Sequence, residues 1–213
     1  KISGNTRGVF ITYVQGFNGL TENLLDVLSE KRIPLIEDVC ESHGATFKGA
    51  KLGSFGLMSN FSFYFAHHMT TIEGGMICTN DKKIFHLAKI LRSHGMARES
   101  GDKSYEKKII NNNPRLSPKF IFLYPAYNFR NNEIGAVIGL NQIKSLNKNN
   151  NLRKRNFKIF LKNLSDIKYR VDFNILGSCN YAFPLILKEG NFKNRDSGSI
   201  YSNPISERLL AAV

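Results

Sequence analysis

Cysteine is scarce in this sequence, and long apolar runs are absent. The three cysteines, Cys40, Cys78 and Cys179, lie far apart and form no CxxC pair. This spacing argues against a disulfide scaffold, a zinc site or an iron–sulfur cluster within these residues, so we expect no metal site. No apolar run approaches the roughly 20 residues that a membrane-spanning helix requires. We therefore expect a cytoplasmic protein with no membrane partner.

Acidic residues are also few. The sequence has 30 Lys and Arg against 17 Asp and Glu, which gives a net charge of +13. Such an excess raises the question of a polyanionic partner. However, lysine and asparagine recur along the whole chain, and no zinc-finger, helix-turn-helix or aromatic–basic RNA signature is present. We therefore expect no nucleic-acid partner, although a basic surface would suit a nucleotide-diphosphate substrate.

The common signatures of nucleotide-binding and hydrolytic enzymes are missing as well. The sequence contains no GxGxxG, P-loop, GxSxG or HExxH pattern. Dinucleotide-binding, nucleoside-triphosphatase, α/β-hydrolase and zincin functions therefore lack support.

The first 40 residues have the pattern of a strand–helix–strand unit. Residues 9–14 (VFITYV) are apolar and β-branched, which predicts a buried strand. Thr21 is the expected N-cap of a helix that runs to Lys31, and residues 34–36 predict a second strand. Such a crossover is right-handed and its strands are parallel. Asp38 should therefore lie at the carboxyl end of a strand, the edge where these sheets bind ligands.

The later elements surround a polar segment, residues 62–76 (SFYFAHHMTTIEGGM). The pattern predicts strands at 61–65 and 76–78, a helix over 81–93 capped by Thr79 or Asn80, and a mobile polar loop at 99–118. It then predicts a helix from 133 to about 146 capped by Asn131 or Asn132, a basic helix at about 151–164, and strands at 169–173 and 181–187.

Two adjacent histidines are the main candidates for chemistry in the polar segment. His67 and His68 are candidates for a general base or for metal ligands. Because neighbouring side chains of an extended segment point to opposite faces, we expect at most one of them to face a cavity. His94 is either a further polar ligand or a histidine that complements a helix dipole. We expect Glu73 to anchor the turn before Gly74.

Three residues near the strand ends have open interpretations. Asp38 either pairs with a cationic ring nitrogen of a cofactor or caps a helix or loop. Glu41 either faces the same cavity or is a solvated loop residue. Ser62 either binds a phosphate or hydroxyl group or is structural.

Several motifs, in the right order, resemble the DegT/DnrJ/EryC1/StrS family. Its members are pyridoxal-phosphate (PLP) enzymes of fold type I that act on nucleotide-linked keto sugars. The matching segments are residues 36–45 (IEDVCESHGA), 53–54 (GS), 61–63 (FSF), 73–76 (EGGM), 91–95 (LRSHG) and 127–130 (YNFR). The resemblance implies an α/β fold with a mostly parallel sheet and part of a smaller α+β domain. It assigns residues 1–130 to the C-terminal part of the large PLP-binding domain, and 131–213 to connecting helices and a partial small domain.

One position departs from the family's aminotransferases. They carry a lysine that binds the cofactor covalently, and His67 stands at that position here. Because imidazole cannot replace that amine, ordinary transamination should be impaired. Within the family, this change marks the C3-dehydratases of deoxysugar biosynthesis. Glu41, where aminotransferases usually have glutamine, points the same way.

The resemblance also assigns roles by position. Asp38 would pair with the pyridine nitrogen of the cofactor, Glu41 would lie beside its ring, and Ser62 would hold its phosphate or O3′ side. Asn128, with Arg130, would reach the cofactor phosphate of the neighbouring subunit, which implies a homodimer with shared sites. His94 and Arg98 would line the sugar pocket.

The implied reaction uses pyridoxamine phosphate, the aminated form of the cofactor. His67 would move a proton while the C3 hydroxyl of a nucleotide-linked 4-keto-6-deoxy sugar leaves. L-glutamate would then restore the aminated cofactor. Two alternatives stay open, a nucleotide-sugar aminotransferase and a non-catalytic binding or regulatory remnant. Because the family's N-terminal segment precedes Lys1, we expect a fragment of a longer enzyme.

Overall fold

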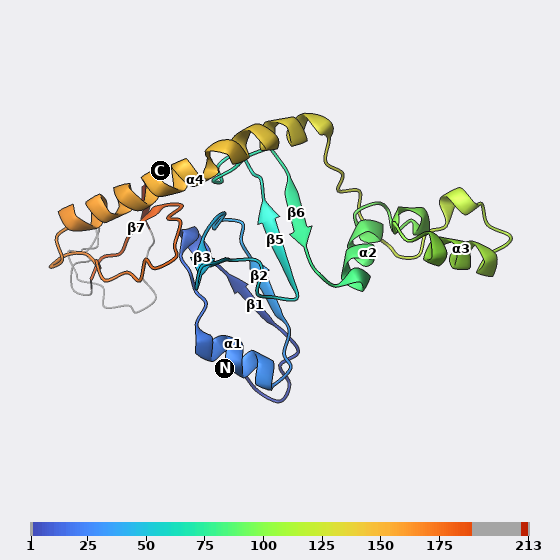
Figure 1. Cartoon of the computed structure of the whole chain (residues 1–213), viewed down its shortest axis with the longest axis horizontal. Helices are drawn as coiled ribbons and strands as arrows, with labels where there is room; N and C mark the ends of the chain where they lie inside the picture. The colour runs from blue at the N-terminus through green and yellow to red at the C-terminus, as the bar shows by residue number, and fades with distance from the viewer. Residues whose placement is uncertain (1, 189–209, 213) are drawn as a thin grey trace, which may run out of the picture.

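A four-stranded sheet forms the centre of the computed structural model, which describes residues 2–188 and 210–212 (Figure 1). Its strands are β1 (Val9–Thr12), β2 (Leu35–Asp38), β5 (Met58–Ser62) and β6 (Gly75–Cys78), in the order β1-β2-β5-β6. The first three are parallel, and β6 runs antiparallel to β5. The predicted mostly parallel sheet is confirmed.

The register of this sheet brings three polar residues into one row at its carboxyl edge. Thr12 pairs with Asp38, and Asp38 pairs with Asn60. The strands differ from their predicted bounds. β1 ends at Thr12 because residues 14–16 turn into a 3-10 helix. β5 begins three residues before the predicted strand and ends at Ser62, after which the chain turns.

The predicted crossover helix is α1 (Glu22–Glu30). Its N-cap is Thr21, as expected, and the Thr21 hydroxyl accepts a hydrogen bond from the Leu24 N–H at 3.2 Å. The apolar face of α1 packs on the sheet through Leu28, in a buried core that includes Tyr13, Leu20, Leu28, Leu35, Val39, Ala45, Leu52 and Cys179. A small hairpin, β3 (Thr46–Phe47) and β4 (Ala50–Lys51), follows β2.

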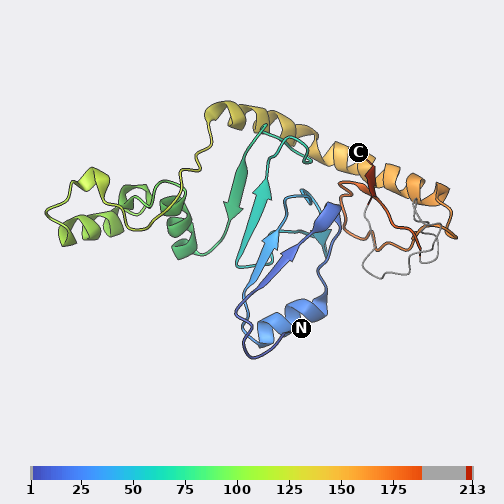
Figure 2. The same cartoon turned by 180° about the vertical axis from the view of Figure 1, so that it is seen from behind.

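The segment after β6 contains more helix than the sequence predicts. Helix α2 (Lys82–Leu91) is capped by Asp81, not by Thr79 or Asn80, because the Asp81 carboxylate accepts from two free N–H groups of the first turn. The expected mobile loop at 99–118 is wrong. It holds α3 (Lys103–Asn112), capped by Asp102, between two short 3-10 helices, η2 (Ala97–Glu99) and η3 (Pro118–Phe120). This part projects away from the sheet (Figure 2).

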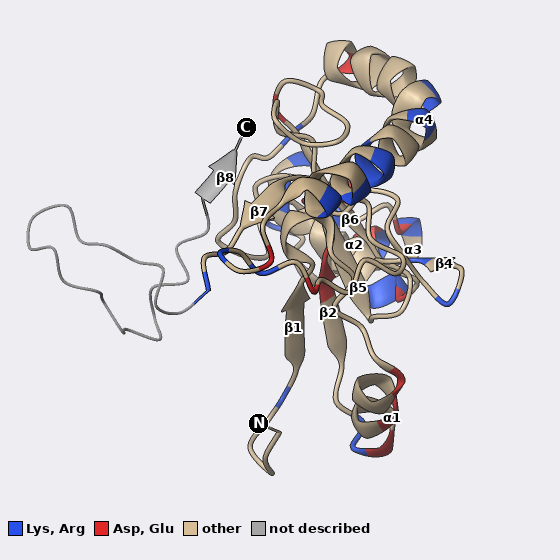
Figure 3. Cartoon of the chain, turned by 90° about the vertical axis from the view of Figure 1, so that its left-hand side faces the viewer, with Lys and Arg blue, Asp and Glu red and all other residues tan. Residues whose placement is uncertain are grey.

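One long helix replaces the two predicted after residue 132. Helix α4 (Glu133–Asn163) is continuous because residues 147–150 contain no glycine or proline that would end it. Asn132 caps it, accepting from the Gly135 N–H at 2.8 Å. It passes the carboxyl end of β5, and Lys and Arg residues cluster along part of it (Figures 1 and 3). Within the described residues, no helix is both long and apolar enough to span a bilayer.

The C-terminal part has less strand than expected. β7 (Phe183–Leu185) pairs antiparallel with β8 (Leu210–Ala212). The predicted strand at 169–173 is wrong, because only a single bridge, between Tyr169 and Leu187, forms there. Residues 189–209 and 213 of the predicted 131–213 unit lie outside the described residues.

Candidate functional site

Asp38 ends β2 with its carboxylate held by three neighbours. Its Oδ1 accepts hydrogen bonds from the Asn60 side-chain amide at 2.9 Å and from the Cys40 N–H at 3.1 Å. The Thr12 hydroxyl donates to Oδ2 at a longer 3.4 Å. Among the described residues, no ion pair involves this half-buried carboxylate. Asp38 therefore caps the following loop through Oδ1, and Oδ2 is the oxygen better placed for a cationic ligand.

The adjacent carboxylate, Glu37, has a structural environment instead. It is fully buried on the opposite face of β2. It accepts hydrogen bonds from the Tyr13 hydroxyl at 2.8 Å and from the N–H groups of Gly53, Phe55 and Gly56 at 2.6–2.8 Å. Glu37 thus fixes the 53–56 loop under the sheet edge, and Asp38 remains the carboxylate that faces the site.

Glu41 is half-buried and hydrogen-bonded. Its Oε2 accepts a hydrogen bond of 2.6 Å from the N–H of Gln15, which has a positive φ of 55°. Its charge also acts on Tyr181, where burial first and Glu41 second raise the pKa of the phenol. Glu41 therefore holds the loop after β1 and borders the same region as Tyr181.

The paired histidines both lie beside a third imidazole, that of His43. Neither lines the cavities described below, so the expectation that at most one of them faces a cavity stays a prediction. The ring of His43 lies 6.2 Å from that of His67 and 5.9 Å from that of His68, between ring centroids. The alternation rule fails because residues 65–69 form turns rather than an extended strand. The Tyr181 ring closes the cluster, at 5.6 Å from His67 and 5.5 Å from His68.

Two of the three imidazoles are neutral at pH 7. Burial lowers the pKa of His43 to about 4, with the nearby His67 lowering it further and the Ser62 backbone opposing the change. Burial lowers the pKa of His68 to about 3, helped by the positive charge of Arg153. His67 is only half-buried and lies at the open side of the cluster.

Ser62 ends β5 beside this cluster. Its hydroxyl oxygen accepts a hydrogen bond from the Tyr64 N–H at 3.3 Å, and its backbone acts on His43. Asp38, Glu41, Ser62 and His67 thus gather at the carboxyl edge of the sheet. Sequence reasoning singled out neither His43 nor Tyr181. The position of His43 inside the matched 36–45 motif was the one available signal.

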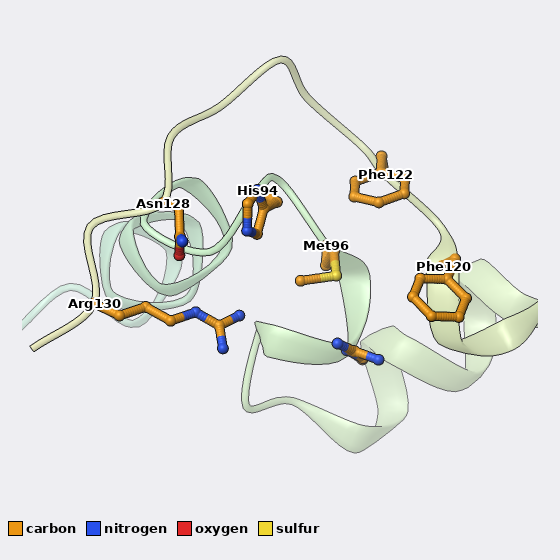
Figure 4. Close-up of a pocket in the computed structure, with 7 residues that line it drawn as sticks. His94, Met96, Phe120, Phe122, Asn128 and Arg130 are labelled. Carbon is orange, nitrogen blue, oxygen red and sulfur yellow. The ribbon is translucent and has the colours of Figure 1, made fainter. Parts of the chain in front are cut away.

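The other four predicted residues form a second group. His94, Arg98, Asn128 and Arg130 line a cavity of about 380 Å³ together with Met96, Phe120 and Phe122. Asn128 and Arg130 lie at one end of it, Phe120 and Phe122 at the other (Figure 4). Neither His67 nor Asp38 lines it.

Glu99 partly balances the charge of this cavity. Its Oε1 lies 3.4 Å from the Arg98 Nε and 3.6 Å from an Arg130 guanidinium nitrogen. Asn128 and Arg130 also line a larger cavity of about 890 Å³ that extends to Asn60, the residue that donates to Asp38. Asp38, Glu41, Ser62 and His67 do not line this larger cavity, and it approaches Asp38 through Asn60.

No set of three or more His, Cys, Asp or Glu side chains in the described part of the chain has the arrangement of a metal site. The groups available for chemistry at the sheet edge are the Asp38 carboxylate, the half-buried imidazole of His67 and the Ser62 hydroxyl. This donor set suits an aromatic cation and proton transfer.

The chain is similar to known proteins over most of its length. Residues 1–197 match the DegT/DnrJ/EryC1/StrS aminotransferase family. A GDP-4-keto-6-deoxy-D-mannose 3-dehydratase from Escherichia coli O55:H7 is 30% identical over 212 residues, which cover 96% of this chain and 54% of that protein. This chain therefore spans about half the length of the curated relatives it matches.

Two further matches bear on the chemistry. A crystal structure of GDP-4-keto-6-deoxymannose-3-dehydratase with a trapped PLP-glutamate geminal diamine has a TM-score of 0.72 at 27% identity, covering 93% of this chain and 50% of that one. A UDP-4-amino-4,6-dideoxy-N-acetyl-beta-L-altrosamine transaminase from Campylobacter jejuni is 32% identical over 141 residues, covering 66% of this chain and 33% of that protein. The fold-type-I class predicted for the sheet is confirmed.

Proposed function

Because the chain belongs to the DegT/DnrJ/EryC1/StrS aminotransferase family of PLP-dependent enzymes, we propose that the protein containing it removes the C3 hydroxyl from a nucleotide-linked 4-keto-6-deoxy sugar. The observation that carries this proposal is His67, an imidazole in the position where the resemblance expects a cofactor-binding lysine. The similarity to 3-dehydratases supports it.

The residues at the sheet edge fit the cofactor. The Asp38 carboxylate is oriented by Thr12 and Asn60 and has no ion-pair partner among the described residues, so it would hold the protonated pyridine nitrogen. When bound, the cofactor supplies an electron sink for breaking bonds next to the sugar's C4 carbon. Glu41 would border the ring, and Ser62 would hold the phosphate or O3′ side.

His67 would move the proton. A neutral imidazole takes up a proton near pH 7 and returns it to a departing hydroxyl as water leaves. His43 and His68 are neutral because burial lowers the pKa of both, so they place no positive charge next to the one that His67 acquires. The Tyr64 and Tyr181 rings, 5.8 and 5.6 Å from the His67 ring, restrict its orientation.

The second group of residues would bind the sugar nucleotide and the partner's cofactor. Because His94, Arg98, Asn128 and Arg130 line one cavity, they would serve the same active site. If Asn128 and Arg130 reach the cofactor phosphate of a neighbouring subunit, then His94 and Arg98 also line that subunit's sugar pocket. The proposal therefore includes a homodimer with shared sites.

L-glutamate is the proposed amino donor. It would regenerate pyridoxamine phosphate after each turnover, and the sugar's C4 nitrogen would be released as ammonia. The trapped PLP-glutamate adduct of the similar dehydratase supports this choice.

The test is a product assay on the full-length protein with PLP, glutamate and GDP-4-keto-6-deoxymannose. We expect ammonia and a 3-deoxy-4-keto sugar, detected by a coupled ammonia assay and mass spectrometry. His67→Asn should abolish ammonia release while PLP binding persists. A stable C4-amino sugar as the main product would refute dehydration.

The similar transaminase favours one alternative, a nucleotide-sugar aminotransferase. His67→Lys separates the two functions. If the alternative is right, the wild type already makes an amino sugar, and the lysine variant makes more of it. A non-catalytic binding or regulatory protein would give neither product in the same assay.

A further inference from the structure

Five ring nitrogens in the histidine cluster are buried and lack a hydrogen bond of regular geometry, although the Ser62 and Cys179 backbones lie near enough to oppose the lowering by burial of the pKa of His43 and His68. They are both nitrogens of His43, both nitrogens of His68, and Nδ1 of His67. His43 is 3% exposed and His68 is 6% exposed. A buried polar group without a hydrogen bond destabilises a fold, so native proteins rarely leave several such groups in one place.

The surrounding elements hold His43 firmly in this position. The Asn150 side chain, buried on α4, donates a hydrogen bond of 2.7 Å to the His43 carbonyl oxygen. The His43 ring also packs on Phe61 and Phe63, with centroids 5.8 and 5.7 Å away. Because its backbone and its ring are both held, His43 can help to orient the more exposed ring of His67.

The same helix also fixes the other wall of the cluster. The Arg153 guanidinium donates a hydrogen bond of 2.9 Å to the Tyr181 carbonyl oxygen. Tyr181 thereby stays against His67 and His68. Helix α4 thus positions both the loop that carries His43 and the segment that carries Tyr181.

No hydrogen bond joins the rings of His43 and His67, whose centroids lie 6.2 Å apart. Polar groups at such a separation are commonly joined by a water molecule, which needs two to four polar partners. His43, His68 and the Nδ1 of His67 supply three.

We propose that His43 is a positioning residue, which holds the His67 ring through one buried water and keeps the proton of neutral His67 on Nδ1. The Nε2 of His67 is then the nitrogen free to accept a proton from the substrate side. This inference rests on the proposed role of His67 as the base, but its first test does not require activity.

The test is ¹⁵N NMR of the histidine rings in the full-length protein at neutral pH. These residues contain only five histidines, and single substitutions assign their signals. We expect His67 to show one protonated Nδ1 and one unprotonated Nε2. In His43→Phe, which keeps a ring but removes its nitrogens, the two His67 shifts should move toward each other as the tautomers mix.

His86→Gln is the control, because His86 lies elsewhere, with its Nδ1 2.7 Å from the Ser100 carbonyl oxygen. It should leave the His67 signals unchanged. An unchanged His67 pattern in folded His43→Phe would overturn the proposal. If that variant does not fold, His43→Gln decides, because its amide keeps a donor and an acceptor. Retention of the wild-type tautomer in His43→Gln supports the proposal, and its loss contradicts it.

Kinetics give a second measurement. His43→Phe should lower kcat about 10- to 100-fold with little change in KM, the size expected when a reacting group is misplaced by about 1 Å. His43→Gln should recover most of the loss. If the wild type has no dehydratase activity, the proposed function fails, while the tautomer measurement still decides the role of His43.

Discussion

Glu37 is predicted to be the carboxylate on which the site's loop depends for stability. Glu37→Ala removes the acceptor of the Tyr13 hydroxyl and of three backbone N–H groups at residues 53–56. Tyr13 is fully buried, whereas residues 53–56 are partly exposed. We therefore take about 1 kcal/mol for each N–H and about 1–3 kcal/mol for the hydroxyl, a loss of about 4–6 kcal/mol in all.

Glu37→Gln should cost less. Its amide can place the oxygen towards Phe55 and Gly56 and the nitrogen towards Tyr13, whose hydroxyl can rotate to accept. One N–H group, that of Gly53, is then left without an acceptor, so the expected cost is about 1–3 kcal/mol. A larger loss of stability in Glu37→Ala than in Glu37→Gln is the result expected if Glu37 stabilises the loop through its hydrogen bonds.

The measurement is urea unfolding of the full-length protein, followed by circular dichroism. Asp38→Ala is the matched control, because it removes the neighbouring carboxylate, which is only half-buried and holds a single backbone N–H group. It should lose clearly less stability than Glu37→Ala. Equal unfolding midpoints for the two alanine variants would refute this reasoning.

Three further predictions follow from charges in and near the site. Asp38→Asn should weaken PLP binding at least tenfold, measured by absorbance titration, with little change in stability. Burial lowers the pKa of His43 from 6.5 to about 4 and that of His68 from 6.5 to about 3, so the unfolded state binds more protons than the folded state in this range. The free energy of unfolding should therefore fall as the pH drops from 6.5 towards 4. His43→Phe should make that fall shallower. Because burial and Glu37 raise the pKa of Tyr13, stability should also fall above about pH 10, where the unfolded tyrosine ionises first, and Tyr13→Phe should reduce this loss.

Local patterns in the sequence are enough to predict the framework of the sheet edge. The apolar runs and the Thr21 cap predict the strand–helix–strand unit, because such signals act over a few residues. The position of Asp38 follows from strand direction alone. The ordered motifs predict the family, and His67 is visible as a departure at a single position.

Tertiary structure decided which of these residues meet. His43, His68 and Tyr181 join His67 because a turn replaces an extended segment and because α4 binds the backbone of two distant loops. His94 and Arg98 share a cavity with Asn128 and Arg130, away from His67. Such contacts join residues far apart in the chain, and their free energy comes from burial and hydrogen bonding that local propensity does not contain.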